Sequence, residues 1–390
     1  MSIAALPVDA MVAICDHLEL SYYFALRLTC RATYNNTIEI SARRCYTSIS
    51  LLLTSDSLCR LEEIAADDIL RTFVQKIWIV PALFEGKEKM TDSRFAHSKF
   101  GNGARKGWKG NAAELQARYI AFQAIEEDHR AISKSSALRD TLDRCLPRFE
   151  NAVVFGLQSD PMERLLNLEK GSYIRCLGLP ELRNQLSCTG RPSTWFDGCY
   201  LPVMGNAHAF AFSALVETII NSNREVLALH TCRGYYCGMT MRNLQLTESQ
   251  YKRLLPLLRE LECLHMCLRL PRKQEDLDKS GFCFLLDILV AVAPTLKTLV
   301  FFQWHPKYEL NPRYFEELSR GLHFSQLQDL SLQSIEVTVN TLKAFLQSAA
   351  ATLRRMTLKS VGLRDPITSA PDLGPMDRES RIRDRNLRLL

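Results

Sequence analysis

The hydrophobic positions in the second half of the chain follow one recurring pattern. The spacing Leu-x-x-Leu-x-Leu, with Met or Phe at some positions, fits residues 261–266, 296–301, 327–332 and 353–358. Each segment is expected to hold a short strand, because bulky apolar residues alternate with polar ones there. A weaker strand is expected over 226–229.

A helix is expected before each strand. Thr247 and Gln250 have the spacing of a capping box, and Asn311 precedes Pro312, which suits the first helical turn. The strand pattern is a signature of leucine-rich repeats, in which each unit buries its apolar face against its neighbours. The predicted fold class is therefore α/β, with an open, irregular leucine-rich-repeat-like solenoid over 156–365. A doubly wound nucleotide-binding sheet is disfavoured, because the chain has no G-x-G-x-x-G or G-x-x-x-x-G-K-[ST] motif.

The first half is less regular. Residues 1–45 are expected to form short helices, with Met11, Ile14, Cys15 and Leu18 on one helix face. A helical connector is expected over 46–155, with strands near 73–79 and before Phe155. Within this connector a mobile, basic, glycine-rich loop is expected over 85–110, and a disordered tail is expected over 366–390.

Composition narrows the class of protein. The 390 residues, 47% hydrophobic and 24% charged, suffice for two or three folding units. The longest apolar stretch, 285–294, is too short to cross a bilayer and predicts a buried helix. The net charge of +6 does not indicate a nucleic-acid binder. The 13 cysteines, an odd number, favour free thiols in a reducing compartment, so we expect a cytoplasmic or nuclear protein without a secretory signal.

The N-terminal sequence carries a specific motif. Leu6-Pro7 is followed by Ile14 and Leu18 at helical spacing, and then by the run Leu26-Arg-Leu-Thr-Cys-Arg31. This order resembles the F-box, a three-helix motif that docks on the Skp adaptor of cullin-RING ubiquitin ligases. The whole chain is similar to the F-box proteins with leucine-rich repeats that are common in filamentous fungi. The resemblance implies that the adaptor-binding residues are Leu6, Pro7, Ile14, Leu18, Leu26, Leu28, Cys30 and Arg31.

The sequence also departs from the F-box pattern. Ala10 stands where a larger aliphatic residue is usual, Tyr23-Phe24 replaces Asp-Leu, and Tyr34 replaces a frequent tryptophan. Docking has a physical reason, because three short helices cannot bury all of their apolar side chains. Each Leu or Ile covered by a partner contributes roughly 1.5–3 kcal/mol. The alternative is that these side chains pack on the chain's own connector.

A surface for a target protein is expected on the predicted strands. If Leu264 and Met266 point inward, the alternating residues point to the opposite face. The candidates for substrate contact are then Cys263, His265, Cys267, Val300, Phe302, Trp304, Ser331, Gln333, Arg355, Thr357 and Lys359. A register change of one residue would reverse this assignment.

No enzyme or metal site is predicted. The residues His230, Cys232, Cys237, Cys263, His265 and Cys267 could hold zinc, but their spacing does not match known zinc sites. The chain has no G-x-S-x-G or H-E-x-x-H motif. We therefore expect no catalytic residue, no metal and no cofactor.

The expected function is that of a substrate-recognition subunit of an SCF-type ubiquitin ligase. Its partners would be the Skp adaptor, the ligase bound through that adaptor, and an unknown target protein, with no nucleic acid and no membrane. Two alternatives remain: a protein-interaction scaffold built on the same repeats without a ligase, and an enzyme or zinc protein that uses the Cys and His residues.

Overall fold

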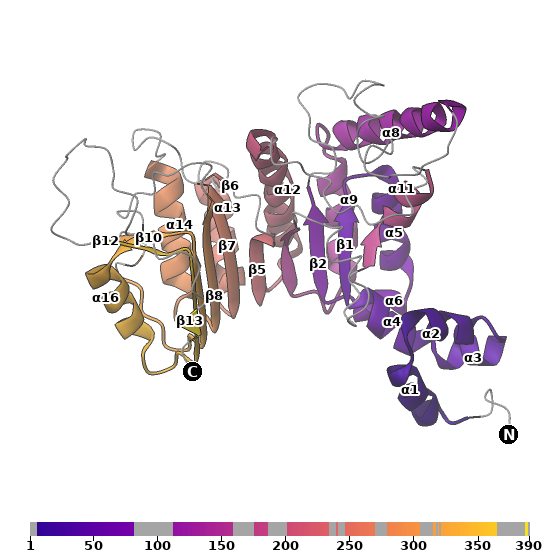
Figure 1. Cartoon of the computed structure of the whole chain (residues 1–390), viewed down its shortest axis with the longest axis horizontal. Coiled ribbons are helices and arrows are strands. Elements are labelled where there is room, and N and C mark those ends of the chain that lie inside the picture. The colour runs from indigo at the N-terminus through magenta and orange to yellow at the C-terminus, as the bar shows by residue number, and fades with distance from the viewer. Residues whose placement is uncertain are drawn as a thin grey trace.

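The computed structural model describes most of the chain and shows a mixed α/β architecture (Figure 1). The described residues are 6–81, 112–158, 175–185, 201–233, 239–240, 246–269, 279–304, 315–316, 319, 321–364 and 387–388. No helix among them is both long and apolar enough to cross a bilayer.

The chain begins with a small helical unit. Its helices are α1 (Val8–His17), α2 (Leu20–Arg27), α3 (Arg31–Asn36) and α4 (Ile38–Tyr46). Met11, Cys15, Tyr23 and Ile40 form a hydrophobic core of their own, distinct from the main core. In Figure 1, α1 to α3 lie beyond the end of the sheet, with α4 and α6 (Leu70–Phe73) between them and the strands.

One mostly parallel sheet dominates the remainder. The main strands lie side by side and run parallel in the order β1 (Ser48–Leu52), β2 (Lys76–Val80), β3 (Val154–Gln158), β5 (Ala228–Arg233), β7 (Cys263–Arg269), β8 (Thr298–Trp304), β9 (Asp329–Gln333) and β11 (Arg355–Lys359). The sheet is open, with β4 (Arg175–Leu177) beside β1 at one edge and β13 (Leu387–Arg388) antiparallel to β11 at the other.

Two smaller pairings complete the strands. β6 (Met239–Thr240) pairs with the end of β7. β10 (Glu336–Thr338) and β12 (Gly362–Arg364) form a separate parallel pair.

Helices follow one another along the sheet (Figure 1). Their bounds are α5 (Ser55–Ala66), α8 (Ala112–Ile132), α9 (Ala137–Cys145), α11 (Leu179–Gln185), α12 (Leu201–Ser222), α13 (Glu248–Leu254), α14 (Lys279–Val292) and α16 (Val339–Ala349). Short 3-10 turns follow α9 at Leu146–Arg148 and α13 at Leu255–Leu258.

The strand register aligns one apolar residue from each strand into a row that runs across the sheet. This row consists of Ile49, Ile77, Phe155, Leu229, Leu264, Leu299, Leu330 and Met356. Apolar residues of α5, α9, α12, α14 and α16 join it in one continuous core. A second row on the opposite face consists of Ser50, Trp78, Gly156, His230, His265, Val300, Ser331 and Thr357.

The strands expected in the second half are confirmed. Each of the four repeated segments ends in a strand, and β5 follows the weaker signal at 226–229. The capping box at Thr247 is present, with the hydroxyl accepting from the Gln250 backbone N–H, and α14 contains most of the apolar stretch 285–294. The helix expected at Asn311 begins outside the described residues.

The domain boundary expected between residues 155 and 156 falls within a strand. Residue 156 lies in the middle of β3, and the connector expected over 46–155 contributes β1, β2 and the first two residues of β3 to the same sheet as the later strands. The loop expected over 85–110 lies outside the described residues. Of the tail expected to be disordered, Leu387–Arg388 pair with β11 as β13, and the rest lies outside the described residues.

Candidate functional site

The helical unit exposes large apolar side chains. We call Val8, Tyr22, Phe24, Leu28 and Tyr34 the exposed apolar group; Leu28 is 84% exposed. Apolar residues occur on every side of α2, whose sequence is Leu-Ser-Tyr-Tyr-Phe-Ala-Leu-Arg, but among its described side chains only Tyr23 is fully buried. A small unit with a four-residue core has too little interior to cover the others.

The residues expected to bind an adaptor divide into two sets. Leu6, Leu18 and Leu26 are partly buried and pack against the core of the helical unit, and Ile14 is also partly buried. The exposed residues are Pro7, Leu28, Cys30 and Arg31. The sequence therefore identified Leu28 but missed four members of the exposed apolar group: Val8, Tyr22, Phe24 and Tyr34. The density of aromatic residues in and after α2 was the available signal.

Polar contacts hold the helices of this unit together. The buried Tyr23 hydroxyl donates to the Thr37 carbonyl at 2.8 Å. The Arg27 guanidinium donates to the Ser41 hydroxyl and lies over the Tyr34 ring, 4.6 Å from its centroid. These contacts join α2 to α3 and α4, so the exposed side chains of α2 are held by an ordered scaffold.

Cys30 caps α3. Its sulfur accepts from the Thr33 backbone N–H at 3.5 Å, and the Thr33 hydroxyl lies 2.9 Å away. These hydrogen bonds, that of the Thr33 hydroxyl above all, lower the pKa of the exposed Cys30 thiol. A lower pKa raises the fraction of Cys30 that is thiolate, at a position expected to contact an adaptor.

On the face of the sheet opposite the main core, the exposure of the side chains increases from β1 towards β11. Ser50, Trp78 and Gln158 are buried there, and the Ser50 hydroxyl donates to Gln158 Oε1 at 3.2 Å. From β7 to β9, residues on this face are mostly partly exposed, and on β11 all three are exposed. We call this face, from β5 to β11, the open face of the sheet.

Several residues expected to contact a target lie on the open face. Cys263, His265, Val300, Ser331 and Gln333 are partly exposed, and Arg355, Thr357 and Lys359 are exposed. Across β9 and β11, Arg355 forms an ion pair with Asp329.

Two other candidates are not accessible. Cys267 is completely buried, with its backbone N–H donating to Thr231 Oγ1 at 2.9 Å, and Phe302 is buried as well. Alternation along a strand decides the face of a residue, whereas coverage depends on segments distant in sequence. The Trp304 side chain lies outside the described residues.

Two histidine side chains lie close together on β5 and β7, where the open face begins. Nδ1 of His230 on β5 and Nδ1 of His265 on β7 are 3.3 Å apart. The Trp78 ring packs edge to face on His230, with the ring centroids 4.8 Å apart. Gly156 lies between Trp78 and His230 in the register, and its missing side chain leaves room for this contact.

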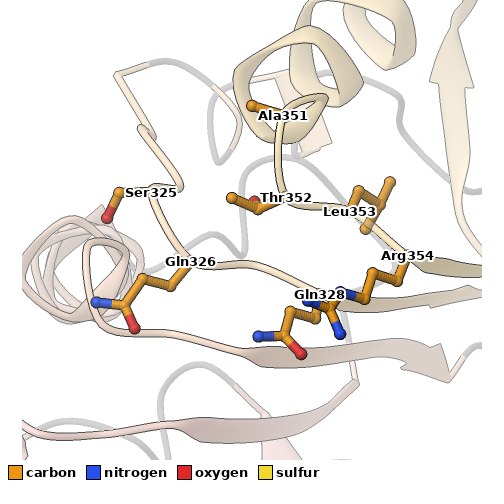
Figure 2. Close-up of a pocket in the computed structure, with 7 residues that line it drawn as sticks. All are labelled: Ser325, Gln326, Gln328, Ala351, Thr352, Leu353 and Arg354. Atoms are coloured by element: carbon orange, nitrogen blue, oxygen red, sulfur yellow. The ribbon is translucent and has the colours of Figure 1, made fainter.

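A polar hollow lies at another edge of the sheet. It has a volume of about 320 Å³ between the segments that lead into β9 and β11 (Figure 2), and it is lined by Ser325, Gln326, Gln328, Ala351, Thr352, Leu353 and Arg354. The Arg354 backbone N–H donates to the Gln328 carbonyl at 2.8 Å. The lining has no carboxylate, thiol or imidazole, so it offers hydrogen bonds but no acid–base or nucleophilic pair.

The described residues also contain no group of three or more His, Cys, Asp or Glu side chains arranged to hold a metal ion. The candidate site is therefore a pair of surfaces: the exposed apolar group on the helices and the open face of the sheet. No protein-family model matches the chain, and no curated protein matches it in sequence.

Proposed function

We propose that this chain is the substrate-recognition subunit of an SCF-type cullin-RING ubiquitin ligase. In this role, residues 1–45 act as an F-box that binds the Skp adaptor, and the sheet domain is an irregular leucine-rich-repeat-like solenoid that binds a target protein. The observation that carries the proposal is that the helical unit has its own small core yet leaves the exposed apolar group uncovered.

The position of the helical unit supports an adaptor-binding role. It lies at one end of the sheet, and Leu18 packs against the helical unit's own core while remaining partly exposed. Ile14 is also partly exposed. Apolar side chains held by an ordered scaffold lose little conformational freedom when a partner covers them. This favours the docking of a partner helix over packing on the chain's own connector.

The sheet domain supports the second part of the proposal. The helices of the main core pack on one face of the sheet, and on the opposite face most described side chains from β7 to β11 are at least partly exposed. The open face combines the apolar Val300, the polar Ser331 and Gln333, and the basic Arg355 and Lys359. Such a mixture suits a protein target. The chain's contribution to ubiquitin transfer would be proximity, because it would hold the target beside the ubiquitin-charged enzyme.

The decisive experiment is co-purification of the full chain with a Skp adaptor from a filamentous fungus. Leu28→Glu is the sharpest variant, because a side chain that is 84% exposed contributes little to folding. Loss of one buried leucine at the interface, about 1.5–3 kcal/mol, should weaken adaptor binding by roughly tenfold or more. Ile120→Glu is the matched control, since Ile120 is an exposed apolar residue on α8.

The expected result is adaptor binding by the wild type and by Ile120→Glu, with strong loss in Leu28→Glu. If the wild type does not bind the adaptor, or if both variants bind it equally, the ligase proposal fails. The chain would then be a protein-interaction scaffold that uses the same sheet. Proximity labelling of proteins near the full chain, compared with an Arg355→Glu/Lys359→Glu variant, would identify the target.

A further inference from the structure

The structure places two histidine side chains, which are potential metal ligands, next to each other although they are far apart in the sequence. His230 and His265 occupy paired positions on neighbouring parallel strands, and their Nδ1 atoms are 3.3 Å apart. At this distance one imidazole can donate a hydrogen bond to the other, so the two Nδ1 atoms already point towards a shared space. Two imidazole nitrogens that bind one Zn²⁺ at about 2.0–2.1 Å, with a tetrahedral angle between them, lie about 3.3–3.4 Å apart. We propose that His230 and His265 together bind a divalent transition-metal ion through Nδ1.

The two imidazoles are held in place by the sheet. β5 is flanked by β3 and β7, and β7 by β5 and β8, so neither histidine lies on an edge strand. Trp78 packs against the His230 ring, and the backbone of Gly156 lies directly beside the Cβ of His230. A metal site gains affinity when its ligands are already in position, because little conformational entropy is lost on binding.

The pair supplies two protein ligands to the ion. Within the described part of the chain, no third His, Cys, Asp or Glu completes a metal-binding group. Both histidine residues are partly exposed, so water can occupy other positions around the ion. A structural zinc site, by comparison, has four protein ligands. Imidazole ligands favour Zn²⁺, Cu²⁺ and Ni²⁺ over Mg²⁺ and Ca²⁺.

The test is metal binding by the full chain after treatment with a chelator. Isothermal titration with Zn²⁺ should show about one site per chain, and either His230→Gln or His265→Gln should weaken it by about tenfold or more. His323→Gln is the control, because His323 is exposed and far along the chain from the pair. Titration with Co²⁺ separates imidazole from cysteine ligation, since thiolates add intense charge-transfer absorption in the near ultraviolet.

The proposal can still be tested if one of the histidine variants fails to fold. Histidine-selective NMR of the wild type during Zn²⁺ addition should shift the signals of two of the eight histidines, and one folded variant suffices to assign them. The proposal is overturned if the wild type binds no Zn²⁺, if both single variants bind as tightly as His323→Gln, or if the Co²⁺ spectrum is dominated by thiolate absorption. None of these readouts depends on adaptor binding, so this site and the proposed ligase role stand or fall separately.

Discussion

The Trp78 indole and the His230 imidazole meet edge to face above Gly156, with their ring centroids 4.8 Å apart and their planes at 63°. The three residues come from β2, β3 and β5, which are widely separated in the chain. Their contact lies at the boundary between the buried part of this sheet face and the open face, which begins at β5. The Trp78 ring packs against His230 at this boundary.

Gly156→Ala should destabilise the protein through this contact. An added Cβ would lie 2.6 Å from the Cβ of His230 and 3.0 Å from Cζ3 of Trp78, so a strand or a ring must move. We expect a loss of about 1–3 kcal/mol in the free energy of unfolding, measured by urea denaturation. Gly362→Ala is the control, because the nearest atom there, at 3.1 Å, belongs to the flexible side chain of Glu336. Equal losses in the two variants would contradict the role given to Gly156.

His129 should make stability depend on pH. Its side chain is buried and Nδ1 donates to the Leu53 carbonyl at 3.0 Å. Burial lowers the pKa of His129 below its ordinary value of 6.5, so the unfolded chain binds a proton more readily than the folded chain. The stabilising contribution is present above pH 6.5 and is lost as the pH falls below that value. The unfolding free energy should therefore decrease less between pH 7.5 and 5.5 in His129→Gln than in the wild type, and parallel curves would refute this.

Tyr23→Phe should loosen the helical unit alone. The variant removes the hydroxyl that donates to the Thr37 carbonyl inside this unit. The Ser41 backbone N–H still donates to that carbonyl at 2.9 Å, so the loss is that of one hydrogen bond, about 0.5–1.5 kcal/mol. Because the unit has a separate core, faster hydrogen exchange is expected in α1 to α4 and not in the sheet. Tyr22→Phe, at an exposed position, should leave exchange unchanged. Acceleration throughout the sheet would show that the two cores unfold together.

The thiols should differ in reactivity towards iodoacetamide at pH 7.5. Cys30 is exposed and its pKa is lowered by hydrogen bonds from Thr33, whereas burial raises the pKa of Cys145 to about 12. Only the thiolate reacts, so Cys30 should be labelled early and Cys145 only after unfolding in urea. Thr33→Val should slow the labelling of Cys30. Peptide mapping by mass spectrometry measures the order, and early labelling of Cys145 in the folded chain would be the contrary result.

The sequence by itself determined the local elements of this protein. The recurring leucine spacing located β7, β8, β9 and β11, and the Thr247 capping box located the start of α13. These signals are local, because strand alternation and helix capping depend on residues within a few positions of one another. The same alternation assigned Leu264 and Met266 to the core and His265 to the opposite face.

Only the tertiary structure decided which residues meet and which remain exposed. The sequence does not show that β1 to β3 belong to the same sheet as the later strands, that Cys267 and Phe302 are covered, or that His230 faces His265. Each depends on strand pairing or packing between segments distant along the chain. Likewise, helical spacing predicts α2, but the small volume of the core beneath it leaves Tyr22 and Phe24 outside.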